Sequence, residues 1–95
     1  MATFISLYNF TDQGIKNVKE SPKRAEAIKA MATKMGVTIK DIYWTVGSYD
    51  MVVVRDGPED AVTSLLLKIG SLGDIRSQTL RAYSASEFGK LVANI

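Results

Sequence analysis

The sequence predicts a single α+β domain in which two main helices cover one face of a four-stranded antiparallel sheet. Its 95 residues are enough for one domain, and no linker or low-complexity segment divides them. Four segments rich in β-branched and aromatic residues are interspersed with segments whose apolar residues recur every three or four positions. Their order is β-α-β-β-α-β followed by one more helix. This order is typical of the ferredoxin-like fold.

The first part of the chain predicts a strand and then a helix. Residues 3–8 (TFISLY) form the strand, and Thr11 is placed to cap a short helical turn after it. Ser21 is a good helix cap, and Pro22 suits the first helical position because its missing N–H is not needed there. Gly36 is a plausible helix end. The apolar stripe of this helix comprises Ala25, Ile28, Ala32 and Met35.

The rest of the chain predicts three strands and two helices. Pro58 opens the first of these helices, and the two acidic residues after it suit the positive end of the helix dipole. Ser84 and Glu87 fit a capping box for the short terminal helix. The strands are predicted at 38–46, 49–55 and 75–83, with Gly47-Ser48 joining the first two.

Composition excludes several classes of function. The chain has neither Cys nor His, which excludes disulfides, zinc sites built from these residues and Ser-His-Asp catalysis. We therefore expect no metal and no cofactor. The net charge of +2 gives no reason to expect nucleic-acid binding. The sequence contains neither a signal-peptide pattern nor an apolar run long enough to cross a bilayer, so we expect a cytoplasmic protein without membrane contact.

The predicted strands are apolar on both faces, which indicates a partner subunit. Right-handed crossovers place both main helices on one side of the sheet, so the other side needs another cover. That face measures on the order of 400 Å², near the upper limit of what a soluble monomer exposes. The terminal helix is too small to cover it. We expect a homodimer, or a higher homo-oligomer, in which two sheets pack face to face as a dimeric α/β barrel.

Strand alternation indicates candidate ligand-binding residues. We expect Ile5 and Leu7 to face the helices and Tyr8 to face the second subunit. By the same reasoning, Thr79 and Arg81 on the last strand point away from the helices. Tyr8, Thr79 and Arg81 would then line either a small-molecule cavity between the sheets or an ordinary interface rim. The other members of these sets are Phe4 and Ser6 on the outer side, and Leu80 and Ala82 on the helix side.

Tyr49 and Asp50 lie beside the predicted hairpin and admit two interpretations. A partly buried Asp50 could act as a general acid or base, or it could accept backbone N–H groups and fix the turn. Alternation places Tyr49 on the opposite face, so the two would not share a pocket. In an enzyme, Asp50 or Tyr8 would be the acid or base and Arg81 would hold an anionic group.

Three segments spread over essentially the whole chain are FTDQGIKNVKESPKR (10–24), YWTVGSYDMVVV (43–54) and GSLGDIRSQTLRAYSASEF (70–88). Together they resemble the GYD-domain family. The resemblance implies a ferredoxin-like protein that pairs into a dimeric α/β barrel, and it implies no catalytic residues. The family is named for a Gly-Tyr-Asp tripeptide; here Ser48 separates Gly47 from Tyr49 and Asp50.

Two functions remain open from the sequence. The first is an uncharacterised homodimeric barrel that binds a small molecule between its sheets or acts through assembly. The alternative is a cofactor-free enzyme, of the monooxygenase or isomerase kind, acting on a small aromatic or acidic substrate. That alternative rests on analogy with other dimeric α/β barrels.

Overall fold

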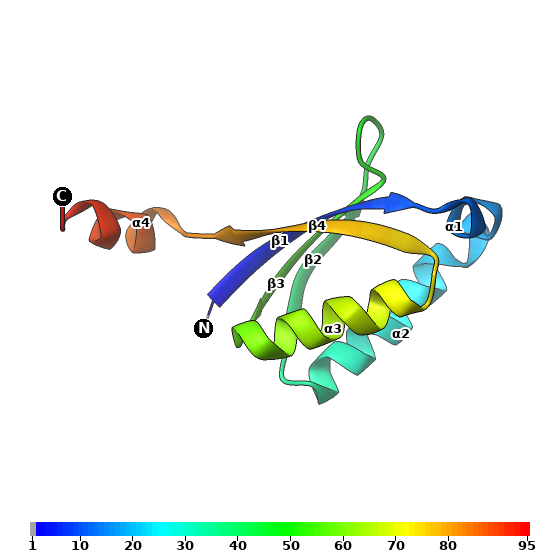
Figure 1. The fold of residues 1–95 in the computed structure, drawn as a ribbon, viewed down its shortest axis with the longest axis horizontal. Coiled ribbons are helices and arrows are strands. Elements are labelled where there is room, and N and C mark those ends of the chain that lie inside the picture. The colour runs from blue at the N-terminus through cyan, green and yellow to red at the C-terminus, as the bar shows by residue number, and fades with distance from the viewer. Residues whose placement is uncertain (1) are drawn as a thin grey trace.

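The computed structural model describes residues 2–95 and contains one antiparallel sheet with two main helices on one face (Figure 1). The strands lie in the order β2-β3-β1-β4, so the ferredoxin-like prediction is confirmed. The elements are β1 (Ala2–Phe10), α1 (Asp12–Lys16), a 3₁₀ turn (Val18–Glu20), α2 (Ser21–Lys34), β2 (Thr38–Trp44), β3 (Met51–Gly57), α3 (Glu59–Ser71), β4 (Ile75–Ala82) and α4 (Ala85–Val92).

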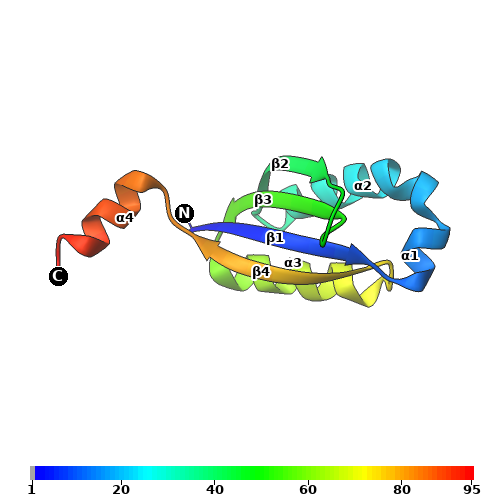
Figure 2. The same ribbon diagram turned by 90° about the horizontal axis from the view of Figure 1, so that it is seen from above.

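The central strand β1 fixes the register of the sheet (Figure 2). Ile5 lies opposite Val54 of β3 on one side and Leu80 of β4 on the other. β2 pairs only with β3, and a register shift occurs between Ile39 and Asp41. Because directly opposed residues point to the same face, these pairings assign the paired strand positions to one side of the sheet or the other.

The predicted facing of β1 and β4 was wrong. Tyr8 is 2% exposed and belongs to the core beneath the helices, whereas Ile5 and Leu7 point to the other face. Thr79 shares the helix side, since its hydroxyl lies 2.8 Å from that of Ser6. Both faces of β1 are apolar, so hydrophobicity could not choose between them, and the aromatic side chains fill the deeper space. The core contains Phe4, Tyr8, Ala32, Val37, Ile39, Met51, Val53, Val62, Leu65 and Ile69.

The face opposite the helices is apolar at its centre and is covered by no element within residues 2–95. Its larger side chains range from partly buried to well exposed, with Tyr43 60% and Leu80 43% exposed. Polar residues border this centre along the sheet margins, among them Thr3, Asp41, Asp56 and Gln78. We call this surface the open face, and it consists of Ile5, Leu7, Tyr43, Val52, Val54 and Leu80.

The hairpin between β2 and β3 is longer than predicted. The strands end and resume at Trp44 and Met51, instead of at residues 46 and 49. The connection is closed by the Thr45 N–H, which donates to the Asp50 carbonyl at 2.8 Å. The loop rises on the side of the sheet away from the helices (Figure 1), and it turns through Gly47 with φ 134°.

The terminal helix α4 stands apart from the rest of the fold (Figures 1 and 2). Its predicted capping box is present: the Ser84 hydroxyl accepts from the Glu87 N–H at 3.1 Å, and a Glu87 carboxylate oxygen accepts from the Ser84 N–H at 2.9 Å. Phe88, Leu91 and Val92 are each about half exposed. Within residues 2–95, no helix is long and apolar enough to span a membrane.

Candidate functional site

Asp50 joins the hairpin to the end of β1. Its carboxylate accepts the Phe10 N–H at 2.8 Å, and its own N–H donates to the Tyr8 carbonyl at 2.8 Å. Its carbonyl is held by Thr45, as described above. The hydroxyl of Tyr49 donates instead to the Gln78 side-chain carbonyl at 3.1 Å. Asp50 and Tyr49 thus have separate partners, and Asp50 has the contacts expected of a turn-fixing carboxylate. A catalytic role for Asp50 or Tyr8 stays a prediction.

The three predicted ligand-binding residues share a face but do not meet in one site. Tyr8 is deeply buried, whereas Thr79 is partly exposed and hydrogen-bonded to Ser6. The Arg81 guanidinium lies 4.2 Å from the centroid of the Tyr83 ring and donates to the Thr3 carbonyl at 3.2 Å. It is exposed near the start of α4. These residues therefore do not line a space between two sheets, because their side of the sheet carries the helices.

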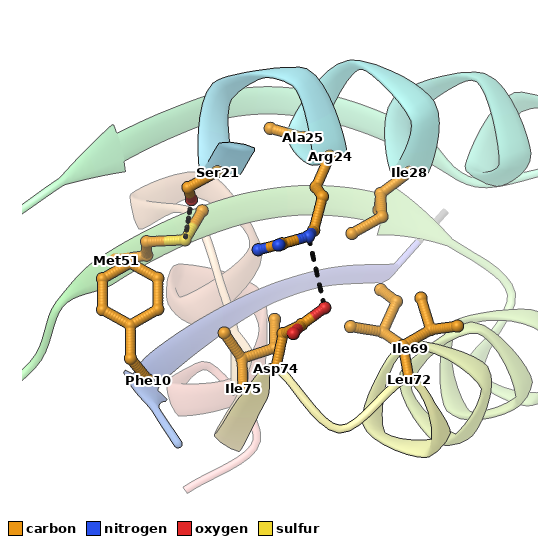
Figure 3. A pocket seen from close by; sticks show the side chains of 10 residues that line it. All are labelled: Phe10, Ser21, Arg24, Ala25, Ile28, Met51, Ile69, Leu72, Asp74 and Ile75. Carbon is orange, nitrogen blue, oxygen red and sulfur yellow. Dashed lines mark hydrogen bonds and ion pairs between the residues drawn. The ribbon is translucent and has the colours of Figure 1, made fainter. Parts of the chain in front are cut away.

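A pocket opens between the sheet and the two main helices (Figure 3). Across it, Nε of Arg24 on α2 lies 3.3 Å from a carboxylate oxygen of Asp74, just before β4. This ion pair is partly exposed and links the two sides of the entrance. The pocket has a volume of about 40 Å³ and is lined by Phe10, Ser21, Arg24, Ala25, Ile28, Met51, Ile69, Leu72, Asp74 and Ile75.

The hydroxyl of Ser21 serves the wall of this pocket and does not cap α2. Ser21 is the first residue of the helix, one position later than a cap, and its hydroxyl accepts from the Trp44 indole N–H at 3.0 Å. The same hydroxyl lies 4.0 Å from the sulfur of Met51. The predicted capping role of Ser21 was therefore wrong, and the residue ties the start of α2 to β2 and β3.

A second cavity of about 20 Å³ adjoins this pocket on the side of the sheet. The two share five lining residues, Ala25, Ile28, Met51, Ile69 and Ile75, and we describe them as an outer and an inner part. We call the whole space the helix-side cavity. Two polar side chains, Tyr8 and Arg55, stand at its inner end among aliphatic residues.

Arg55 is the feature that the sequence reasoning missed. Its side chain is 1% exposed, and Nη2 donates to the Tyr8 hydroxyl at 2.5 Å. Its Nε and Nη1 are buried without a hydrogen-bond partner among the described residues. Arg55 is two positions after Val53 and four after Met51 along β3, so it points to the same face as these two core residues. That period of two could have revealed a charge directed into the core.

Acidic side chains do not assemble into a metal site. In the described part of the chain, no three Asp or Glu side chains are grouped so that they could hold a metal ion. Asp74 is engaged by Arg24 and by the Gln13 amide at 2.9 Å. Asp56 lies at the margin of the open face, 3.7 Å from the Lys40 ammonium.

Comparison with known proteins agrees with this fold. The GYD domain model matches residues 4–92. A protein of Thermus thermophilus described as "Glutamine synthetase and cystathionine beta-lyase binding protein" is 31% identical over an alignment of 90 residues, which covers 92% of this chain and 94% of that protein. The crystal structure of FFRP-DM1 superposes with a TM-score of 0.63 at 20% identity, covering 87% of this chain and 100% of its own, and supports the fold alone. The chain belongs to the GYD-domain family.

Proposed function

We propose that this protein is a homodimeric binding protein: two copies pair through their open faces, and the dimer binds an enzyme. The observation that carries the proposal is the open face itself, six apolar side chains on four adjacent strands with no cover within residues 2–95. An antiparallel sheet that faces water on one side normally alternates apolar and polar residues. β3 does not alternate in this way, because Val52 and Val54 lie on the uncovered side while Met51 and Val53 fill the core.

Pairing of two open faces is energetically adequate for a stable dimer. Covering on the order of 400 Å² of apolar surface on a subunit contributes up to roughly 10 kcal/mol before the costs of association. A two-fold axis would place the same residues on both sides of the interface, since symmetric dimers use one self-complementary patch. Two sheets packed in this way form an α/β barrel with the helices on its outside.

The relative's description suggests what such a dimer does. That protein is described as binding glutamine synthetase and cystathionine β-lyase, and the two chains match over nearly their full lengths. We infer that this protein also binds an enzyme of one of these two kinds. Assembly is the activity in this proposal, and it requires no catalytic residue in the chain.

The proposal is tested first by self-association. We expect sedimentation velocity at micromolar concentration to give the mass of two 10.4 kDa chains. Val54→Asp places two like charges at the centre of the paired sheets and should weaken the dimer roughly a hundredfold. Leu67→Asp is the matched control, because Leu67 is 72% exposed on α3, which lies on the helix side. A wild-type monomer would contradict the proposal.

Binding to an enzyme is tested second. Immobilised wild-type protein should retain purified glutamine synthetase or cystathionine β-lyase from the same source, and the Leu67→Asp variant should do the same. The Val54→Asp variant should lose this binding if the dimer is the active form. A dimer that binds neither enzyme would leave the assembly in place and contradict the partner assignment.

A further inference from the structure

We propose that the helix-side cavity binds a short aliphatic monocarboxylate, with the carboxylate held by Arg55 and Tyr8. This site lies on the opposite side of the sheet from the open face. It therefore stands independently of the proposed dimer and of its enzyme partner. Three features indicate the ligand: a buried cation without a counter-ion within residues 2–95, an apolar cavity in front of it and the charges at the entrance.

The buried guanidinium of Arg55 needs an anion. Arginine stays protonated in proteins, and a buried charge without a partner is strongly unfavourable even after local relaxation. Its Nε and Nη1 donors have no partner among the described residues. The ion pairs of the described chain are Arg24 with Asp74 and Lys40 with Asp56, so neither of these acids neutralises Arg55. The carboxylate of Asp50 is engaged by the Phe10 N–H.

Tyr8 provides a donor beside the guanidinium. Its hydroxyl accepts a hydrogen bond from Arg55, so its own O–H remains to donate. An anion in the inner cavity could thus accept from N–H groups of Arg55 and from the phenol together. A carboxylate suits this set because each of its oxygens accepts two hydrogen bonds and because its negative charge neutralises the guanidinium.

The remainder of the cavity selects an aliphatic body of limited size. The inner and outer volumes of about 20 and 40 Å³ limit the ligand to a carboxylate with a few carbons at most, and they exclude nucleotides or aromatic systems of several rings. Branched aliphatic side chains and a methionine surround the space, and such walls bind methyl and methylene groups. They are Ile28, Ile39, Ile42, Met51, Ile69 and Ile75.

The entrance favours one negative charge over two. Arg24 attracts an anion to the mouth, whereas Asp74 stands beside it and repels a second carboxylate that would remain there (Figure 3). A dicarboxylate with one end at Arg55 would bring its other end to this acidic side chain. The charges at the two ends of the cavity therefore specify a monocarboxylate.

Calorimetric titration of the full chain with sodium butyrate tests this assignment. We expect saturable binding to wild-type protein, with succinate and the neutral isostere butyramide each at least tenfold weaker. Arg55→Met should reduce butyrate affinity at least tenfold, and Tyr8→Phe should reduce it severalfold because only one donor is lost. All titrations are made at equal ionic strength, since added salt alone screens the entrance charges.

Unfolding measurements separate binding from a purely structural role. Without ligand, Arg55→Met should unfold at the same or a higher temperature, because an apolar side chain replaces an unpaired buried charge. Butyrate should raise the unfolding temperature of the wild type and leave that of Arg55→Met unchanged. If that variant does not fold, the severalfold loss in Tyr8→Phe decides the question. Butyrate affinity equal to that of the wild type in both variants, or no saturable binding of butyrate to the wild type, would overturn the proposal. Water would then be the occupant of the cavity.

Discussion

At the scale of single residues, polar groups in this protein mainly fasten connections to the sheet. Asp50 binds the hairpin to β1, and Ser21 binds the start of α2 to β2. Thr11 does the same for α1: its hydroxyl accepts from the Gly14 N–H at 3.1 Å, and its N–H donates to the Asp74 carbonyl at 3.0 Å. Arg55 is the exception, since two of its buried donors have no hydrogen-bond acceptor among the described residues.

Asp50→Ala should destabilise the fold by about 1–3 kcal/mol, because the Phe10 N–H would lose its acceptor in a partly buried position. Asp50→Asn keeps an amide oxygen at the same place and should cost less. Urea unfolding followed by circular dichroism measures both, and Glu26→Ala on the exposed side of α2 is the control. Equal stability of Asp50→Ala and wild type would return Asp50 to consideration as a functional carboxylate.

Gly14→Ala should also destabilise the protein, by about 1–3 kcal/mol. A Cβ at this position would lie 1.9 Å from the Asp74 carbonyl oxygen, so the backbone of α1 or of the segment before β4 would have to move. Gly70→Ala is the matched control: it lies in α3 with open space around it, and it should gain up to about 1 kcal/mol from helix propensity. Differential scanning calorimetry should show opposite shifts for the two variants.

At the scale of elements, the sequence predicted the helices and their caps better than it predicted the side of the sheet to which each strand residue points. The stripe of α2 and the capping box of α4 were readable because helix periodicity and caps depend on neighbouring residues. The side to which β1 turns Tyr8 was not, because alternate positions on both sides of β1 are apolar and the choice depends on how much space the helices leave. Arg55 could have been found from its period with Met51 and Val53, but its lack of a partner depends on the tertiary structure.

The capping box of α4 should weaken on acidification. The Ser84 N–H, which donates to the Glu87 carboxylate, and secondly the Ser84 side chain hold the pKa of that carboxyl below its ordinary range. A lowered pKa means that ionised Glu87 stabilises the folded helix. This contribution is fully present above the ordinary glutamate pKa of about 4.3 and is lost as the pH falls through the lowered value. Carbon-13 shifts of the Glu87 carboxyl should titrate below the ordinary glutamate value, and Ser84→Ala should reduce the difference without removing it, because the Ser84 backbone N–H that donates to the carboxylate is kept.

At the scale of the whole molecule, the chain is more extended than its length requires. Its radius of gyration is 14.3 Å, against about 12 Å for a compact domain of this size. The excess comes from α4, which continues the line of β4 beyond the sheet (Figure 1). A short helix standing alone in water is marginally stable, so its half-exposed apolar residues call for a surface outside their own subunit. In the proposed dimer that surface belongs to the second copy.

Replacing the apolar side of α4 should therefore weaken self-association. In the Phe88→Ser/Leu91→Ser double variant, two large side chains lose their burial against the other subunit, and each is worth about 1.5–3 kcal/mol when fully buried. We expect the dissociation constant of the dimer, measured by sedimentation equilibrium, to rise at least tenfold. Lys90→Ala on the same helix is the control, since it leaves the apolar residues in place. An unchanged dissociation constant in the double variant would show that the open faces alone hold the dimer and that α4 serves another surface.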